Sequence, residues 1–482
     1  MNQAVYEDLR SFIEACKAVD RWHEVRDADW KHEIGTLSEL AAEKDEPPML
    51  IYDRIKGYPE GYRIASLVVA STKRAALALG LPLDQPKLEL IRLAAKKIKE
   101  VKLLPPAEVR DGPVMENRMT GNDVDLLRFP APQFHAKDGG RYLGTGDIVI
   151  MREPESGYLN MGTYRMQVHE RNLLGLWISP GKNGRLIRQR YWDQGKSCPV
   201  VAAFGQDPVT FHAANQYIPW GVSELEFAGG FRGKPIQVIR GPVTGLPIPA
   251  HAEIAIEGET PPPSEQARDE GPFGEWPGYY SGGTIGTGEP QPVIRVKALY
   301  HRNNPIIMDE APLWPFAGRA GIPVTAGILW DKLERAGIQD VVGVWTYSSF
   351  LKVVSIRQRY AGHAKQAGMA ACALQPYLGR YTVVVDEDID PTDIKEVLWA
   401  MQTRVDPITD IETVGGCWAG PLDPRMSPEK RAARDYTSSQ AIFYAVRPFH
   451  WREKFPQVSR SERELKLKIM EKFRSILSPG GD

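Results

Sequence analysis

Apolar residues recur at helical and strand spacing through the first part of the chain. Leu9, Phe12, Ile13 and Cys16, for example, share one face of a helix. Helices are predicted at residues 5–19, 72–79 and 87–101, and short strands at residues 49–52 and 66–69. The alternation favours a small α/β unit that reaches about residue 110. A proline-rich segment at residues 129–133 then marks a boundary.

Short apolar runs separated by Gly and Pro dominate the chain from about residue 140 to residue 310. Strands are predicted at residues 147–151, 174–178, 200–204, 236–239, 253–256 and 293–299. Helical patterns interrupt them at residues 185–192 and after Ser223, which is a suitable N-cap. Many short strands with such turns are typical of a barrel-like β domain.

Helix and strand alternate again after about residue 320, which predicts a second α/β layer. Helices are expected at residues 327–336, 362–374 and 393–402, and strands at residues 341–346, 353–357 and 381–385. The tail, residues 461–477, is expected to be an amphipathic helix with Leu465, Ile469, Phe473 and Leu477 on one stripe. The stripe must be buried on its own core or on a neighbouring subunit. The irregular segment at residues 447–460 favours the neighbour.

Composition and charge narrow the class of protein. A chain of 482 residues is expected to form two or three domains. With 60 Lys plus Arg and 61 Asp plus Glu, the net charge of −1 argues against nucleic acid or an anionic membrane as the main partner. The four cysteines form no paired motif and are expected to be buried thiols in a reducing compartment. No stretch is long enough to span a bilayer, and no signal peptide is visible, which predicts a cytoplasmic protein.

The most informative stretch is Glu270-Gly-Pro-Phe-Gly-Glu275-Trp-Pro-Gly-Tyr-Tyr280, which carries two carboxylates. Residues five apart point to opposite faces of a strand. A turn at Pro272 and Gly274 is therefore expected to bring both acids into one site. Such a pair can hold one carboxyl group as a proton donor while its neighbour stays ionised. The alternative is a solvated turn without a role in chemistry.

Two further segments carry candidate ligands. In Asn160-Met-Gly-Thr-Tyr-Arg165, Gly162 permits close approach of a ligand and Arg165 offers a planar fork for a carboxylate or phosphate. Asn160 can give a carbonyl oxygen to a hard cation. The alternative is the rim of a hairpin with a surface arginine. Glu224, expected in the first turn of a helix, either complements the helix dipole or binds a divalent ion that bridges to a phosphate.

Other patterns argue against several kinds of site. The Gly-rich run at residues 282–288 has no strand before it and no helix after it, so a dinucleotide fingerprint is not supported. The acidic run at residues 386–390 is expected to be a solvated turn with an N-cap. The histidines His169, His212, His251 and His363 show no metal-ligand spacing. No Gly-x-Ser-x-Gly elbow and no Cys/His nucleophile arrangement is present.

Taken together, the motifs resemble the UbiD family of reversible decarboxylases, which use prenylated FMN. The resemblance runs through most of the chain and is strongest from about residue 145 to residue 310. The motifs that carry it are Asn160-x-Gly-x-Tyr-Arg165, Gly221-Val-Ser-Glu224, Pro249-Ala-His-Ala-Glu-Ile254 with Glu257-Gly258, Glu270-Gly-Pro-Phe-Gly-Glu275 with Gly278-Tyr, Tyr360-Ala-Gly-His-Ala-Lys365, and Val397-Leu-Trp-Ala-Met401 with Thr403-Arg404.

The resemblance implies an α/β (α+β) protein of three domains. These are an N-terminal α/β domain at residues 1–115, a split β-barrel that binds the flavin at residues 116–318, and a C-terminal α/β oligomerisation domain with a terminal amphipathic helix at residues 319–482. It also implies a homodimer or homohexamer, and a UbiX-type flavin prenyltransferase as the supplier of the cofactor.

The family's functional residues map onto this sequence one by one. The implied catalytic residues are Arg165, Glu270 and Glu275, and Asn160 and Glu224 are the implied Mn²⁺ ligands, with K⁺ nearby. The implied cofactor-binding residues are Asn160, Met161, Gly162, Thr163, Tyr164, Arg165, Gln216 and Glu224. Some members add a histidine ligand; here the matching stretch has none, and Asn183 is expected in its place, so its carbonyl oxygen, water or phosphate would complete the metal shell.

The implied reaction is reversible, non-oxidative decarboxylation of an aromatic, heteroaromatic or α,β-unsaturated carboxylic acid, with CO₂ as a product. Loss of CO₂ from an sp² carbon needs an electron sink that side chains do not provide. Arg165 would grip the substrate carboxylate and hold Glu270 ionised, and Glu275 would donate the proton with a raised pKa. Leu313, Trp314 and Phe316 are expected in the pocket wall or, equally, in the core. The alternative function is a weakly active flavin-binding subunit of a larger carboxylase/decarboxylase complex.

Overall fold

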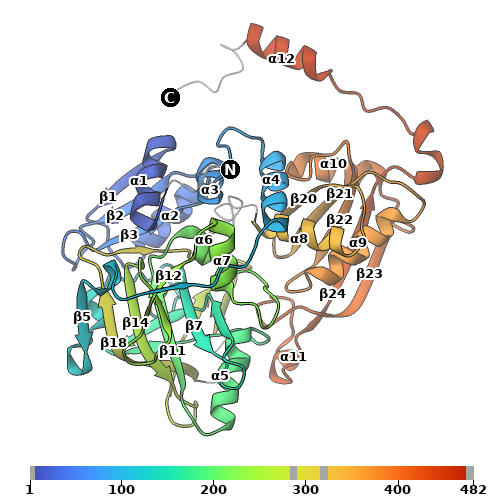
Figure 1. Cartoon of the computed structure of the whole chain (residues 1–482). Helices are drawn as coiled ribbons and strands as arrows, with labels where there is room; N and C mark the ends of the chain where they lie inside the picture. Colours follow the sequence, from blue (N-terminus) through green and yellow to red (C-terminus); the bar gives the residue numbers. More distant parts are fainter. Residues whose placement is uncertain (1–5, 283–289, 315–323, 474–482) are drawn as a thin grey trace.

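Successive stretches of the chain build three layered units in the computed structural model (Figure 1). The structure describes residues 6–282, 290–314 and 324–473. The N-terminal unit is drawn in blue, the central β unit in cyan to yellow, and the C-terminal unit in orange to red. The order of helices and strands confirms the mixed α/β class that the sequence predicts.

The N-terminal unit is a four-stranded sheet with helices packed against it. The strands, in sheet order, are β1 (Trp22–Arg26), β2 (Met49–Asp53), β3 (Arg63–Ser66) and β19 (Ile306–Met308). The helices are α1 (Leu9–Val19), α2 (Glu33–Ala42), α3 (Thr72–Leu79) and α4 (Lys87–Lys99). Because β19 comes from much later in the sequence, the N-terminal sheet is completed by a strand that follows the central unit.

The strand predicted at residues 66–69 is wrong, because β3 ends at Ser66. Leu67 takes a left-handed conformation with φ of 57°, which turns the chain out of the sheet. The turn leads into Ser71, whose side chain accepts a hydrogen bond from the backbone N–H of Arg74 and caps α3. Burial and capping therefore override the strand propensity of the two valines that follow Leu67.

The central unit is a curved, antiparallel sheet of ten strands that forms a half-barrel. Its main path runs β6 (Arg141–Gly144), β9 (Met166–Glu170), β10 (Leu173–Gly175), β18 (Gln291–His301), β14 (Ile254–Thr260), β11 (Cys198–Phe204), β7 (Asp147–Arg152) and β8 (Leu159–Gly162). β5 (Asn117–Thr120) and β15 (Ala267–Arg268) also pair with β18. Two small sheets join it: β4 (Ala107–Val109), β12 (Gln237–Arg240) and β13 (Pro247–Pro249) in one, β16 (Pro272–Gly274) and β17 (Tyr280–Gly282) in the other.

The alternation of side chains along the half-barrel strands explains their nearly continuous apolar sequence. In β7, Val149 and Met151 pack into one core, while Ile148 and Ile150 pack into a second core on the other face. Both faces are therefore buried, as in sheets covered on two sides. The helices of this unit are α5 (Asn183–Asp193), α6 (Pro208–Ala214) and α7 (Glu224–Arg232), with single 3₁₀ turns at Pro113–Met115, Gly121–Asp123 and Leu126–Arg128.

The C-terminal unit is a five-stranded mixed sheet flanked by helices. Its strand order is β20 (Val341–Ser348), β21 (Leu351–Ile356), β22 (Tyr381–Asp386), β24 (Thr437–Ala445) and β23 (Ile411–Trp418). Its helices are α8 (Val324–Arg335), α9 (His363–Leu374), α10 (Ile394–Arg404) and α11 (Pro428–Ala432). Ile91 and Ala95 of α4 share a core cluster with Leu329 and Leu333 of α8, so the first and last units pack directly on each other.

The acidic run at residues 386–390 differs from the solvated turn that the sequence predicts. Asp386 is buried, and its carboxylate lies 2.9 Å from Nη1 of Arg404. Asp388 forms a second pair with Arg404 at 2.7 Å. The N-cap of α10 is Asp393, outside the run. The expectation for the cysteines holds for three of them, whereas Cys417 is only half-buried.

The tail helix is shorter than predicted. α12 spans Arg463–Lys472 and follows a 3₁₀ segment at Phe449–Lys454. It projects from the rest of the chain (Figure 1), and its apolar residues are exposed: Leu465 by 51%, Ile469 by 40% and Phe473 by 39%. Leu477 lies outside the described residues. The stripe is thus not buried on the described core of its own chain.

No helix among the described residues is both long enough and apolar enough to cross a membrane.

Candidate active site

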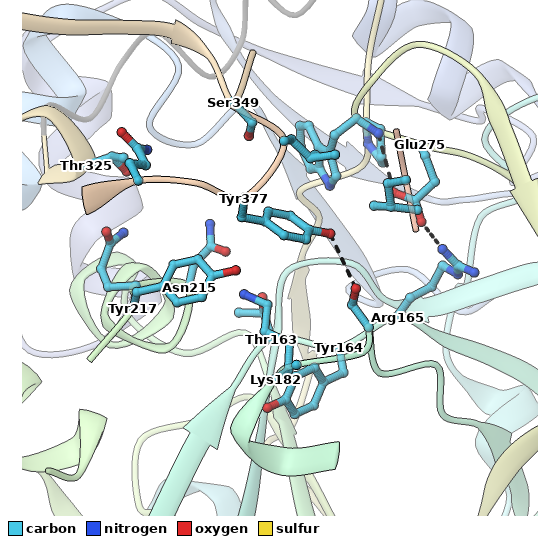
Figure 2. Close-up of a pocket in the computed structure, with 18 of the residues that line it drawn as sticks. Thr163, Tyr164, Arg165, Lys182, Asn215, Tyr217, Glu275, Thr325, Ser349 and Tyr377 are labelled. Carbon is cyan, nitrogen blue, oxygen red and sulfur yellow. Dashed lines mark hydrogen bonds and ion pairs between the residues drawn. The ribbon is translucent and has the colours of Figure 1, made fainter. Parts of the chain in front are cut away.

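A cavity of about 440 Å³ lies between the half-barrel and the C-terminal unit. The half-barrel side contributes Thr163, Tyr164, Arg165, Trp177 and Glu275, and the C-terminal side contributes residues of α8 and the segment after α9. Figure 2 shows these side chains converging on one space, with Arg165 and Glu275 together at one end. The chain therefore builds the site at a domain boundary, where ligand sites are common.

Arg165 is the centre of a buried cluster of charges. Its Nε lies 2.5 Å from Oε1 of Glu270, and its Nη2 lies 2.8 Å from Oε2 of the same carboxylate. Its Nη1 also donates to Oε1 of Glu275. The three side chains are nearly inaccessible to solvent. The structure thus brings the three predicted catalytic residues together, with Glu270 held in the bidentate geometry that favours specific pairing.

The two acids meet Arg165 by a different route from the predicted one. Pro272 and Gly274 do not form a turn; they begin and end β16, which pairs with β17. The chain reverses instead at Gly271, whose φ is 73°, and in the turn after Glu275. A Cβ atom on Gly271 would lie only 2.7 Å from Cα of Gly139, so glycine at both positions lets the two segments touch.

The guanidinium of Arg165 is also fixed by aromatic rings. Its Cζ lies 4.5 Å from the ring centroid of Trp177 and 4.8 Å from that of Phe273. Burial alone would lower the pKa of Arg165, but the charges of Glu270 and Glu275 outweigh it and raise the pKa. Arg165 therefore stays charged. Only three of its five N–H donors are used in the bonds above, which leaves donors for an anionic ligand.

A second polar cluster joins Asn160 of β8 to Glu224 at the start of α7. Nδ2 of Asn160 lies 3.0 Å from Oε1 of Glu224, and the backbone N–H of Met161 donates to Oε2 at 2.8 Å. Tyr164 donates its hydroxyl to Oδ1 of Asn160 at 3.2 Å. Asn160 and Glu224 are each 3% exposed and lie behind the cavity wall that Tyr164 forms.

This second cluster has the properties of a cation site. Burial raises the pKa of Glu224 to about 7, against the lowering effect of its hydrogen bonds and of Lys182. Ser223 occupies the N-cap position as predicted, but its side chain makes no capping bond, and its buried Oγ has no hydrogen-bond partner among the described residues. A buried acid without a salt-bridge partner, bonded to the amide of Asn160 and next in sequence to an unpartnered hydroxyl, is compatible with a hard metal ion.

The other predicted cofactor-binding residues are divided between the cavity and the core. Thr163, Tyr164 and Gln216 line the cavity. Met161 is fully buried in a core cluster on the far face of β8. Gly162 leaves room for the Tyr164 hydroxyl, which would lie 2.3 Å from a Cβ atom there. The close approach that this glycine permits is thus occupied by the chain itself.

Asn183 is the first residue of α5 and lies close to the Asn160 cluster. Its Nδ2 is 3.4 Å from the hydroxyl of Tyr158. The neighbouring Gly184 donates its backbone N–H to the Tyr164 hydroxyl at 3.1 Å. The first turn of α5 therefore packs on the ring that separates the cavity from Asn160. Among the described residues no hydrogen bond joins Asn183 to Glu224, so the role of Asn183 stays a prediction.

Three side chains of the cavity were missed at the sequence level. Tyr377, from the segment after α9, points its hydroxyl toward Ser179 of the half-barrel, with the two oxygens 3.4 Å apart (Figure 2). Lys182, just before α5, lies beside the rings of Tyr217 and Tyr377. Burial lowers the pKa of Lys182 to about 8. Their sequence carries no motif, since only the fold brings residues 179, 182 and 377 together.

The aromatic and apolar residues after residue 310 were expected in the pocket wall or, equally, in the core, and the structure decides for Leu313 and Trp314. Leu313 belongs to the main core cluster, and Trp314 is 55% exposed and does not line the cavity. Phe316 lies outside the described residues, as does most of the Gly-rich run at 282–288. Glu310 and Pro312 line the cavity instead. Among the described residues no group of three or more His, Cys, Asp or Glu side chains is arranged to hold a metal.

Comparison with known families gives three matches that follow one another along the chain. Residues 13–94 match the N-terminal domain of 3-octaprenyl-4-hydroxybenzoate carboxy-lyase, UbiD. Residues 107–313 match its Rift-related domain, and residues 320–445 match its C-terminal domain.

Individual relatives agree with this match. A phenolic acid decarboxylase of Bacillus subtilis is 31% identical over 437 residues, which is 88% of this chain and 90% of the relative. A pyrrole-2-carboxylic acid decarboxylase of Pseudomonas aeruginosa is 28% identical, covering 88% of each chain. The UbiD-class enzyme HmfF of Pelotomaculum thermopropionicum, solved with FMN, has a TM-score of 0.82 at 28% identity and covers 96% of this chain and 100% of its own. An evolved dimeric form of HmfF, solved with prFMN, has a TM-score of 0.79 at 26% identity, with 95% and 98% covered.

Proposed function

The chain belongs to the UbiD family of decarboxylases, and from this membership we propose that it removes CO₂ from an aromatic, heteroaromatic or α,β-unsaturated acid with prenylated FMN as its cofactor. The observation that carries the proposal is the buried cluster of Arg165, Glu270 and Glu275 at one end of the cavity. Relatives that act on a phenolic acid and on pyrrole-2-carboxylic acid support an aromatic substrate.

The second cluster fits the phosphate end of such a cofactor. Asn160 Oδ1 and a Glu224 carboxylate oxygen would hold Mn²⁺, and the unpartnered Ser223 Oγ is suited to the K⁺ that accompanies it in the proposal. Thr163, Tyr164 and Gln216 would contact the cofactor from the cavity wall. When bound, prenylated FMN supplies the electron sink that stabilises the electron pair left by CO₂.

The residues at the other end position the substrate and move one proton. The remaining N–H donors of Arg165 bind the substrate carboxylate, and Glu270 keeps the guanidinium oriented. The net charge of Arg165, Glu270 and Glu275 together is zero when one of the two carboxyl groups is protonated. Burial favours this state because it disfavours a net charge. As the C–CO₂ bond breaks, Glu275 gives that proton to the carbon, and solvent returns a proton to its carboxylate before the next turnover.

Replacing Glu275 by Gln tests the proton donor. The variant is expected to retain bound flavin and metal. Its rate of decarboxylation is expected to fall about 10²- to 10⁴-fold or more, because the amide has no acidic proton to give. The assay is CO₂ release from a panel of phenolic, pyrrole and acrylic acids, with protein produced beside a UbiX-type flavin prenyltransferase.

Glu265→Gln is the matched control, since that carboxylate is 53% exposed and pairs with Arg295 away from the cavity. Turnover of Glu275→Gln near the wild-type rate would remove the role assigned to Glu275. If the wild type with prenylated FMN released no CO₂ from any acid, the weakly active subunit would become the better description.

The exposed stripe of α12 supports a homodimer or homohexamer, with the helix buried on a neighbouring subunit. Leu465→Lys with Ile469→Lys is expected to shift the mass in solution to a smaller species, as measured by light scattering. Lys466→Ala is the control on the same helix. An unchanged mass would separate α12 from assembly. Cytoplasmic localisation stays a prediction.

A further inference from the structure

Lys182 brings a positive charge into the cavity wall that no described carboxylate meets in a salt bridge. The residue stands at the N-cap of α5, which leaves its side chain free to extend into the cavity. Its Nζ lies 4.3 Å from the ring centroid of Tyr217 and 5.8 Å from that of Tyr377. These rings fix the direction of the side chain, one from the half-barrel and one from the C-terminal unit (Figure 2).

The position of the Lys182 ammonium group in the cavity wall is unfavourable unless an anion pairs with it. Moving an ammonium group out of water costs far more than contact with two aromatic faces returns. Lys182 is half-buried, and lysines withdrawn from water are usually paired. The surface of Lys182 that remains accessible faces the cavity, so its partner is an anion that enters the cavity from solution.

The surroundings of Lys182 distinguish between the possible anions. Its charge acts on Glu224 without a direct salt bridge. Around Mn²⁺, Glu224 and a doubly ionised phosphate leave one negative charge in excess, which an ammonium group offsets together with, or in place of, the proposed K⁺. The other lysine of the cavity, Lys332, belongs to α8 on the C-terminal side, whereas Lys182 directly precedes the turn of α5 that packs on Tyr164, the ring bonded to Asn160. Lys182 is thus better placed than Lys332 to bind a phosphate near Asn160 and Glu224.

We propose that Lys182 binds the phosphate group of the flavin through a charge-assisted hydrogen bond from its Nζ. The inference rests on the proposed function, because it requires a flavin in the cavity with its phosphate near Asn160 and Glu224. Lys182 then supplies a fixed positive charge next to Asn183, on one side of the proposed metal site. The other occupant to be tested is a second carboxylate of the substrate.

Binding of unmodified FMN and of riboflavin, which lacks the phosphate, tests this inference on the full chain purified without flavin and supplied with Mn²⁺. The variants are Lys182→Met, Lys182→Arg and the control Lys332→Met. Lys182→Met is expected to weaken FMN about 10- to 100-fold and to leave riboflavin unchanged, since one charge-assisted bond is lost. Lys182→Arg is expected to keep most of the preference for FMN, and Lys332→Met all of it.

Each outcome decides the matter. An unchanged ratio of riboflavin to FMN dissociation constants in Lys182→Met would overturn the inference and leave the proposed function intact. Equal loss of both ligands in that variant would also overturn it, because the effect would then lie in the shape of the cavity. A wild-type chain that binds neither flavin would overturn the proposed function together with the inference.

Discussion

Buried carboxyl groups of the central unit differ in what balances their charge. Glu270 and Glu275 share the guanidinium of Arg165. Asp309, by contrast, receives only neutral donors, including the Ser66 hydroxyl at 2.5 Å, and burial raises its pKa to about 7. Asp147 is in the same position, and burial raises its pKa well above the usual value. The first pair is compensated by the chain, and the second is compensated by holding protons.

The comparison bears on the role proposed for Glu224. Like Asp309, it is buried without a salt bridge, and burial raises its pKa to about 7. Unlike Asp309, it lies beside an amide group and an unpartnered hydroxyl, those of Asn160 and Ser223. A protonated structural acid needs only donors or acceptors that saturate it. An acid that is bonded to an amide and next in sequence to an unpartnered hydroxyl has neighbours that offer oxygen ligands to a cation from outside the chain.

Arg165→Met is expected to have the largest effect, because it leaves the buried carboxylate of Glu270, and Glu275 beside it, without the cation that both contact. Breaking a buried pair costs about 3–5 kcal/mol, and decarboxylation should fall below detection. Urea denaturation measures the free energy of unfolding, and CO₂ release measures the activity. Arg165→Lys is the matched variant: it keeps the charge, loses the planar fork, and should recover stability more than activity. Stability within about 1 kcal/mol of wild type for Arg165→Met would show that the cluster is not compensated as described.

Asp309→Asn is expected to act in the opposite direction. The folded pKa of about 7 lies above the unfolded value of 3.8, so the native state holds an extra proton between these values. The contribution of Asp309 to stability is then full below about pH 4 and is lost as the pH rises through about 7. The loss amounts to about 4 kcal/mol. The variant should therefore be more stable than wild type above pH 7 and no more stable near pH 4.

The measurement is the free energy of unfolding as a function of pH. Asp84→Asn, at an exposed carboxylate, serves as the control and should follow the wild-type curve. If Asp309→Asn and wild type show parallel curves from pH 4 to pH 8, Asp309 is ionised in the folded protein and belongs with the compensated acids.

Much of the fold was accessible from sequence because periodicity reports burial directly. The helix predicted at 72–79 appears as α3 without change, and the strands of the half-barrel appear within a few residues of their predicted positions. The failures came from contacts between distant segments. β19 completes a sheet some 240 residues earlier in the chain, and Asp386 is buried by Arg404 and Arg447. No local pattern encodes such contacts.

In the site, too, local motifs were predicted from the sequence and contacts between distant segments were not. Arg165, Glu270 and Glu275 were found because they lie in motifs, and the structure joins them. The way in which the acids meet was missed, since it depends on Gly139 touching Gly271 from another segment. Lys182, Ser179 and Tyr377 were missed because Ser179 and Lys182 share one loop and Tyr377 lies in another about 200 residues later, and neither loop carries a signal until the cavity brings them together.

Glu224→Gln is expected to have the smallest effect on the stability of the metal-free protein. It distinguishes a buried acid that the fold keeps protonated, like Asp309, from one that binds a cation. In the absence of metal, the amide keeps an acceptor for Asn160 or for the N–H of Met161 but not for both, so the free energy of unfolding should fall by about 1–3 kcal/mol. With Mn²⁺ at about 100 times its dissociation constant, wild type should gain about 2.7 kcal/mol and the variant almost nothing.

The control is Glu226→Gln, in the first turn of the same helix but half-exposed, which should respond to Mn²⁺ as wild type does. The gain on adding metal is decisive, because it depends on a cation that binds the folded chain and not on packing. A variant that keeps the full gain would place the metal away from Glu224. Glu224 would then join Asp309 as an acid that the fold keeps protonated, and the charge balance that directs Lys182 to a phosphate would lose its basis.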